Sequence, residues 1–194
     1  MSRLSAMKFP TIAALLIAIG LPFCSAEGQR DDQFVWGVGG GTTIVTGAAK
    51  DNHKTAAHGV LMFGIGGVDS PFGVRLDGLY SALGDRGDEG LAIDQGAARV
   101  FSLMGNGVLS LYGSNRKLYL VGGIGGFWYN PDGDGTSTAN DLALGAGAGI
   151  WFPRINGFVE AKFLNFYRAL PDPVTGLKGK KSAQLIPVTL GIMF

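Results

Sequence analysis

The chain has 194 residues, of which 46% are hydrophobic, 33 are glycine and one is cysteine. Its formal net charge is +1, from 16 basic and 15 acidic residues. This balance argues against a nucleic-acid-binding protein, which would carry a basic stripe. Helical patterns are absent, and beyond the N-terminal segment no run of about 18 apolar residues offers a membrane-spanning helix. The length suits one domain.

Residues 1–26 are typical of a secretory signal peptide. Two basic residues come first, an apolar run extends from Phe9 to Leu21, and Cys24-Ser25-Ala26 offers small residues for cleavage. The run is shorter than the roughly 20 residues of a spanning helix, which disfavours an uncleaved anchor. Pro22-Phe23 makes a poor lipidation motif before the cysteine. Cleavage after Ala26 would leave a single domain at 27–194, without cysteine and therefore without disulfides.

Turn-forming residues divide the remainder into eight segments with the pattern of β-strands. Most have ten or more residues, whereas ordinary strands have about five or six and a tilted membrane-spanning strand needs about 9–11. The predicted strands are Phe34 to Val45, Thr55 to Gly67, Phe72 to Leu83, Gln95 to Tyr112, Lys117 to Tyr129, Asp141 to Phe152, Gly157 to Arg168 and Ala183 to Phe194.

The connections between these segments alternate in length along the chain. Long connections at 46–54, 84–94, 130–140 and 169–182 alternate with short ones at 68–71, 113–116 and 153–156. Long outer loops and short periplasmic turns are typical of an up-and-down outer-membrane barrel. Eight strands would also place both chain ends on the periplasmic side.

The strand faces separate apolar from charged residues. In the third segment Val74 and Leu76 share one parity, while Arg75 and Asp77 share the other. A basic residue that faces the bilayer midplane costs about 2–4 kcal/mol, so the charges are expected to point inward. We therefore predict a polar network in the barrel interior. Its members are Arg75, Asp77, Arg99, Glu160 and Lys162.

This network has two interpretations, and one member fits the pattern poorly. Structural plugging of the lumen is favoured, and a narrow ion path or proton relay is the alternative. Arg99 and Asn106 have opposite parity in the fourth segment, although both should avoid lipid. A bulge near Gly105 or Gly107 would reconcile them. Otherwise Arg99 lies beyond the bilayer, in an outer extension of the strand.

The last segment alternates strictly and ends on an aromatic residue. Leu190, Ile192 and Phe194 share one apolar face, which on a soluble protein would invite aggregation. A terminal phenylalanine on such a strand resembles the sorting signal that the barrel-assembly machinery reads. We therefore expect these three residues to act as the assembly signal.

Several segments resemble those of the small bacterial outer-membrane β-barrel family, which includes the OmpA transmembrane domain, OmpX-like proteins and opacity-type porin-family proteins. The resemblance implies an all-β, eight-stranded, antiparallel, up-and-down transmembrane barrel in the outer membrane of a Gram-negative-type bacterium. It also implies a filled, polar interior. The matching segments are Leu103 to Leu109, Leu118 to Gly125, Val159 to Phe163, which has Lys162 where the family has arginine, and the terminal Phe194.

The third long loop has the oxygen-ligand spacing of a twelve-residue calcium loop, with Gly135 at position six. It departs from that pattern at both ends, and strands rather than helices flank it. The alternative is an ordinary turn-rich loop. Calcium is the one cofactor that the sequence suggests. The predicted ligands are Asn130, Asp132, Asp134, Thr138 and Asp141.

Lys178, Lys180 and Lys181 in the last loop could attract the phosphates of lipopolysaccharide, although a plain solvated loop is the simpler interpretation. The chain has two histidines, His53 and His58, and no Ser-His-acid set is identifiable around them. A lipid-modifying enzyme is therefore the least favoured of the membrane functions.

The sequence thus predicts a non-enzymatic, monomeric outer-membrane barrel with a structural or surface-interaction role. Its expected partners are outer-membrane lipid, lipopolysaccharide and, during insertion, the barrel-assembly machinery, but not nucleic acid. A narrow porin is the alternative. A soluble, lipocalin-like barrel with its apolar face inside and its charges outside is the non-membrane rival.

Overall fold

The computed structural model of the chain describes residues 34–51, 53–65, 71–85, 97–111, 117–132, 138–170 and 181–194. Residues 1–33 lie outside these ranges, so the signal peptide and the domain boundary at residue 26 remain predictions. Among the described residues, no helix has the length and apolar character needed to cross a membrane.

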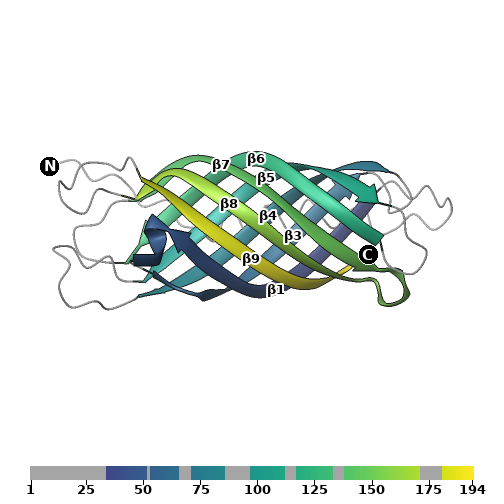
Figure 1. Cartoon of the computed structure of the whole chain (residues 1–194), viewed down its shortest axis with the longest axis horizontal. Coiled ribbons are helices and arrows are strands. Elements are labelled where there is room, and N and C mark those ends of the chain that lie inside the picture. The colour runs from purple at the N-terminus through teal and green to yellow at the C-terminus, as the bar shows by residue number, and fades with distance from the viewer. Residues whose placement is uncertain are drawn as a thin grey trace, which may run out of the picture. The chain divides into compact units, whose positions relative to one another are not determined.

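The described residues form an antiparallel sheet that closes on itself (Figure 1). Each long strand pairs with its neighbours in the chain, β5 with β4 included, and β9 pairs with β1 to close the barrel. The predicted eight-stranded barrel is therefore confirmed. Its strands are β1 Phe34–Gly47, β3 Ala56–Ile65, β4 Phe72–Asp85, β5 Ala98–Leu111, β6 Lys117–Pro131, β7 Ala139–Phe152, β8 Gly157–Leu170 and β9 Lys181–Met193.

The two ends of the barrel differ in their connections. The short connections β3–β4, β5–β6 and β7–β8 share one end with the C-terminus, on the right in Figure 1. The last of them contains the 3-10 turn η3 Pro153–Ile155, which ends at Asn156 in the left-handed conformation with φ 50°. We call this the turn end and the opposite end the loop end.

The first long connection has more structure than the sequence predicted. Instead of a plain loop it contains the 3-10 helix η2 Ala48–Asp51 and the two-residue strand β2 His53–Lys54. Strand β2 pairs with the last residues of β4, His53 with Asp85 and Lys54 with Gly84. This pairing extends the barrel wall at the loop end.

The C-terminal ladder forms the closing seam. Strand β9 pairs with β1 from Met193 opposite Gly37 to Ala183 opposite Gly47. The Phe194 N–H donates to the Trp36 carbonyl at 2.7 Å, and the two rings stack with centroids 4.3 Å apart. Leu190, Ile192 and Phe194 are all exposed on the outer face. Their use as an assembly signal remains a prediction.

The outer face of the barrel is apolar and the inner face carries the charges. In β4 the outward residues Val74 and Leu76 are 62% and 44% exposed, whereas the inward residues Arg75 and Asp77 are 8% and 3% exposed. The same separation extends around the barrel, where large apolar side chains of every long strand are exposed. A lipid-facing barrel has this arrangement, and a soluble barrel has the reverse.

Candidate functional site in the barrel lumen

Four charged side chains from two opposite parts of the wall meet in the middle of the lumen. Arg75 and Asp77 come from β4, and Glu160 and Lys162 come from β8. Alternate residues of a strand share a face, so each strand presents one acid and one base inward. All four side chains are buried, with exposures between 2% and 8%. We call these four residues the ionic cluster.

Arg75 is the bridge between the two strands. Its Nη2 donates to both carboxylate oxygens of Glu160, at 2.9 and 2.8 Å, and to Asp77 Oδ2 at 2.9 Å. Lys162 Nζ pairs with Asp77 and lies 3.8 Å from Glu160 Oε1. Two cations therefore alternate with two carboxylates, and the cluster is neutral. Mutual compensation of this kind is what makes buried charges tolerable.

Two neutral side chains complete the ionic cluster. The Tyr119 hydroxyl of β6 donates to Glu160 Oε2 at 2.8 Å, and Asn106 of β5 accepts from Lys162 at 3.4 Å. Asn106 also donates to the carbonyl of Met104 at 3.1 Å. Tyr119 was not among the predicted site residues. Its inward parity, five residues before the outward Ile124, is the pattern that could have identified it.

A second group of hydrogen-bonded polar side chains lies beside the ionic cluster and includes His58. His58 Nδ1 is 3.0 Å from the Thr43 hydroxyl, and His58 Nε2 is 2.9 Å from the Thr189 hydroxyl. The Ser81 hydroxyl donates to Thr43 at 3.2 Å. Thr189 also stands opposite Glu160 in the β8–β9 register, which brings the two polar groups together. The side chains of Thr43, His58, Ser81 and Thr189 are all buried.

An apolar layer fills the lumen at the loop end. Phe127 and Phe166 lie at its centre, each 1% exposed, with ring centroids 4.8 Å apart. Between the ionic cluster and Leu79 and Leu164 lies a cavity of about 10 Å³, which is at the lower limit for one water molecule. The layer consists of Val45, Leu83, Ala98, Val100, Phe127, Tyr129, Ala143, Phe166, Ala183 and Leu185.

Comparison with known proteins bears on the fold. No protein-family profile matches the chain, and no curated protein matches it. Among solved structures it resembles Ail, the attachment invasion locus protein of Yersinia pestis, with a TM-score of 0.53 and 16% identity over 84% of this chain and 99% of Ail. It also resembles Neisserial surface protein A, NspA, with a TM-score of 0.51 and 12% identity over 83% of this chain and 96% of NspA.

The fold is that of the small outer-membrane β-barrels. In such a barrel the outward side chains face lipid and the loop end is the place for external contacts. Four outward aromatic residues mark the ends of the apolar band, as the aromatic girdles of such barrels do. They are Phe72 and Phe194 near the turn end, and Tyr80 and Trp128 toward the loop end.

Arg99 does not join the ionic cluster, which corrects the sequence prediction. Strand β5 pairs without a register shift with both neighbours, so the proposed bulge is absent from it. Arg99 points outward at the loop end, where it donates to Asp132 Oδ2 at 3.3 Å. Their side chains are 61% and 46% exposed. The long strand thus carries Arg99 beyond the apolar band of the outer-membrane barrel fold.

The predicted calcium ligands are only partly described. The Thr138 hydroxyl donates to Asn130, Asp132 pairs with Arg99, and Asp141 Oδ1 accepts the N–H of Leu142 at 2.7 Å. Asp134 lies outside the described residues. No group of three or more His, Cys, Asp or Glu side chains with metal-binding geometry occurs among the residues that the structure describes. The calcium site stays a prediction.

Of the three lysines of the last long loop, the structure describes only the last. Lys181 is the first residue of β9, and Lys178 and Lys180 lie outside the described residues. Contact with lipopolysaccharide therefore also stays a prediction.

His53 is buried against Tyr129 of the apolar layer at the loop end. Its side chain is 1% exposed, and its Nε2 lies 2.6 Å from the Tyr129 hydroxyl. Burial lowers the pKa of His53, while the nearby Asp85 carboxylate and the Gly84 carbonyl act in the opposite direction. This contact could not be predicted from local sequence patterns, because 76 residues separate the two partners.

We expect acid to weaken the packing of β2 against the barrel. An opened β2 takes up a proton at the ordinary histidine pKa near 6.5, while the closed form resists protonation, so the closed form loses stability as the pH falls through that value. Amide hydrogen exchange at Lys54, corrected for the intrinsic rate, should accelerate between about pH 7.5 and pH 5.5. His53→Gln should remove this dependence. An unchanged pH dependence in the variant would refute the assignment to His53.

Proposed function

We propose that the chain is a small integral outer-membrane protein with a closed lumen, whose role lies in contacts made by its long loops at the cell surface. In this orientation the turn end faces the periplasm and the loop end faces outward. The observation that carries the proposal is the filled lumen, in which an ionic cluster and an apolar layer follow one another along the axis.

Closure follows from the energetics of the lumen. An ion that passed the ionic cluster would have to separate Arg75 from Glu160 or Lys162 from Asp77, and a broken buried pair costs about 3–5 kcal/mol. It would then meet Phe127 and Phe166, which offer no polar partner. A structural lumen is therefore favoured over the narrow-porin alternative.

Planar-bilayer recording tests this proposal. We expect the purified chain to insert without resolvable conductance steps, under conditions in which a general porin gives them. A double variant, Phe127→Ala with Phe166→Ala, removes the centre of the apolar layer. It is the control in which conductance should be easiest to detect. Stable unitary steps from the unmodified chain would contradict closure and favour the narrow porin.

The external role is supported by fold and charge. The name of Ail describes attachment and invasion, and by analogy we propose surface contacts for the loops here. Lys178, Lys180 and Lys181 would bind lipopolysaccharide phosphates. A triple lysine-to-glutamine variant should lose the thermal stabilisation that added lipopolysaccharide gives the unmodified barrel, whereas Lys54→Gln should keep it. Equal stabilisation of both variants would refute the contact.

The proposal includes a monomer without catalytic activity. His58 is held between Thr43 and Thr189 in the interior, with 7% exposure, where a lipid substrate does not reach it. Calcium binding by the loop from Asn130 to Asp141 and recognition of Phe194 by the assembly machinery complete the proposal.

A further inference from the structure

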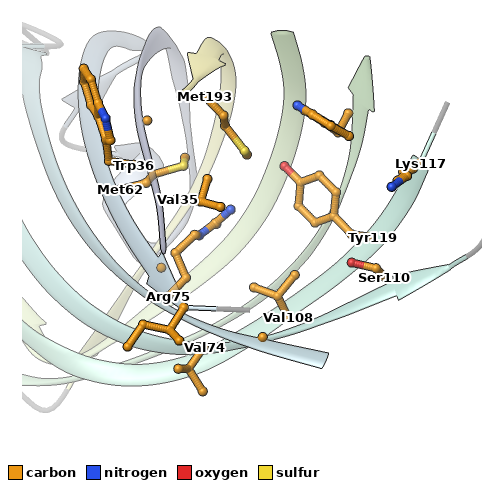
Figure 2. Close-up of a pocket in the computed structure, with 15 residues that line it drawn as sticks. Val35, Trp36, Met62, Val74, Arg75, Val108, Ser110, Lys117, Tyr119 and Met193 are labelled. Carbon is orange, nitrogen blue, oxygen red and sulfur yellow. The ribbon is translucent and has the colours of Figure 1, made fainter. Parts of the chain in front are cut away.

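The turn end of the lumen holds a cavity of about 80 Å³ that the ionic cluster does not fill (Figure 2). Arg75 of the ionic cluster lines it, together with Tyr119, Met62 and Met193. Because this volume is several times the minimum that holds one water molecule, the cavity has room for a small solute. It lies on the side of the ionic cluster that faces the periplasm in the proposed orientation.

Arg75 brings an unused hydrogen-bond donor to the cavity. Its side-chain contacts with Asp77 and Glu160 are made by Nη2 and Nε, and Nη1 has no hydrogen-bond partner among the described residues. The charge of Arg75 is nevertheless balanced, because both carboxylates lie against it. An anion beside Arg75 would be repelled by these carboxylates, whereas a neutral acceptor takes the hydrogen bond without adding a charge.

Trp151 supplies a second donor that lacks an acceptor, and it lines the same cavity. Its Nε1 is buried and has no partner among the residues that the structure describes, although buried indole N–H groups usually find one. The hydroxyl of Tyr119 cannot serve as a further donor to a ligand, because it already donates to Glu160. An oxygen that accepts without donating, such as a carbonyl oxygen, therefore matches the unused groups.

Much of the remaining wall is apolar, with Val35, Met62, Val108 and Met193 among its side chains. A charged ligand would lose its hydration against such a wall, which is costly. We propose that this cavity binds a small uncharged carbonyl compound, with its oxygen at the unused donors and its alkyl group against the valine and methionine side chains. This site is separate from the surface role proposed for the loops, and its test needs no loop contact.

Methionine methyl NMR of the refolded chain in lipid nanodiscs tests the site. The chain has five methionines, of which Met62 and Met193 line this cavity and Met104 does not. Butanone is the probe, sec-butylammonium is the control of similar shape that can only donate, and butyrate is the anionic control. We expect saturable shifts of the Met62 and Met193 signals with butanone at millimolar concentration, no saturation with sec-butylammonium, and weaker binding of butyrate.

Trp151→Phe removes one donor and should weaken butanone binding by about fivefold. Trp128→Phe, the same substitution on the lipid-facing surface, should leave the affinity unchanged. Val108→Phe places a larger side chain in the cavity and should abolish saturation. The gel mobility of unboiled samples verifies that the three variants fold.

Four results would each overturn the proposal. They are a shift that stays linear with butanone, equal saturation with sec-butylammonium, butyrate binding as tight as that of butanone, and identical affinity in the two tryptophan variants. The first would mean that butanone only dissolves in the lipid and that the cavity holds water alone. None of these results bears on closure of the lumen, which the bilayer recording tests separately.

Discussion

Glu160→Gln should destabilise the folded barrel by about 3–5 kcal/mol, the range for breaking a buried ion pair. Glutamine keeps the volume and can still bond Tyr119, but it removes one of the two negative charges that compensate Arg75 and Lys162. The cluster would then hold two cations and a single carboxylate in a buried place. Urea unfolding of the barrel in vesicles, followed by gel mobility, measures the loss.

The exposed pair at the loop end provides the matched control. Arg99→Gln breaks an ion pair of 3.3 Å whose side chains are 61% and 46% exposed, and such surface pairs contribute about 0–1 kcal/mol. The comparison isolates burial, because both variants remove one charge by substituting glutamine. If Glu160→Gln proved as stable as Arg99→Gln, the ionic cluster would not be the structural element described here.

Gly149→Ala should destabilise the barrel by about 1–3 kcal/mol through overpacking. Gly149 of β7 points into the lumen, where Tyr119 lies directly over it. An added Cβ would come within 2.8 Å of Tyr119 Cε1 and closer still to its hydroxyl end. Tyr119 would have to swing away and lose its hydrogen bond to Glu160. Unfolding experiments measure the loss of stability. Tyrosine fluorescence in a tryptophan-free background reports the displacement of Tyr119.

An outward glycine separates this steric effect from a general effect of alanine. Gly122 of β6 faces lipid, and the nearest neighbour of a Cβ there would be the Gly145 carbonyl oxygen at 3.7 Å. Gly122→Ala should therefore be neutral or stabilising by about 0.4–1 kcal/mol. Equal destabilisation by the two substitutions would show that contact with Tyr119 is not the cause.

The strand pattern of the sequence predicted the fold and much of the lumen. Charges cannot face lipid cheaply, so parity alone placed Arg75, Asp77, Glu160 and Lys162 on the inner face, and the structure brings all four together. The strand boundaries agree within a few residues because turn-forming residues flank each strand. Alternation therefore predicted which side chains face lipid and which face the lumen.

Contacts across the lumen could not be predicted in the same way. Parity states which side a residue faces, but it does not state which distant residue it meets. Tyr119 with Glu160 and His53 with Tyr129 depend on the tilt and register of the closed barrel. For Arg99 the sequence left two positions open, the ionic cluster or an outer extension of the strand, and the structure shows the second. Parity alone could not choose between them.

Gel mobility of the outer-membrane fraction, with boiled and unboiled samples compared, tests the central claim most directly. A closed transmembrane barrel resists detergent until it is heated, because each of its eight long strands pairs with a neighbour on both sides. We expect the chain in that fraction, with different mobility before and after boiling. A chain found in the soluble periplasmic fraction, with one mobility under both conditions, would contradict the account.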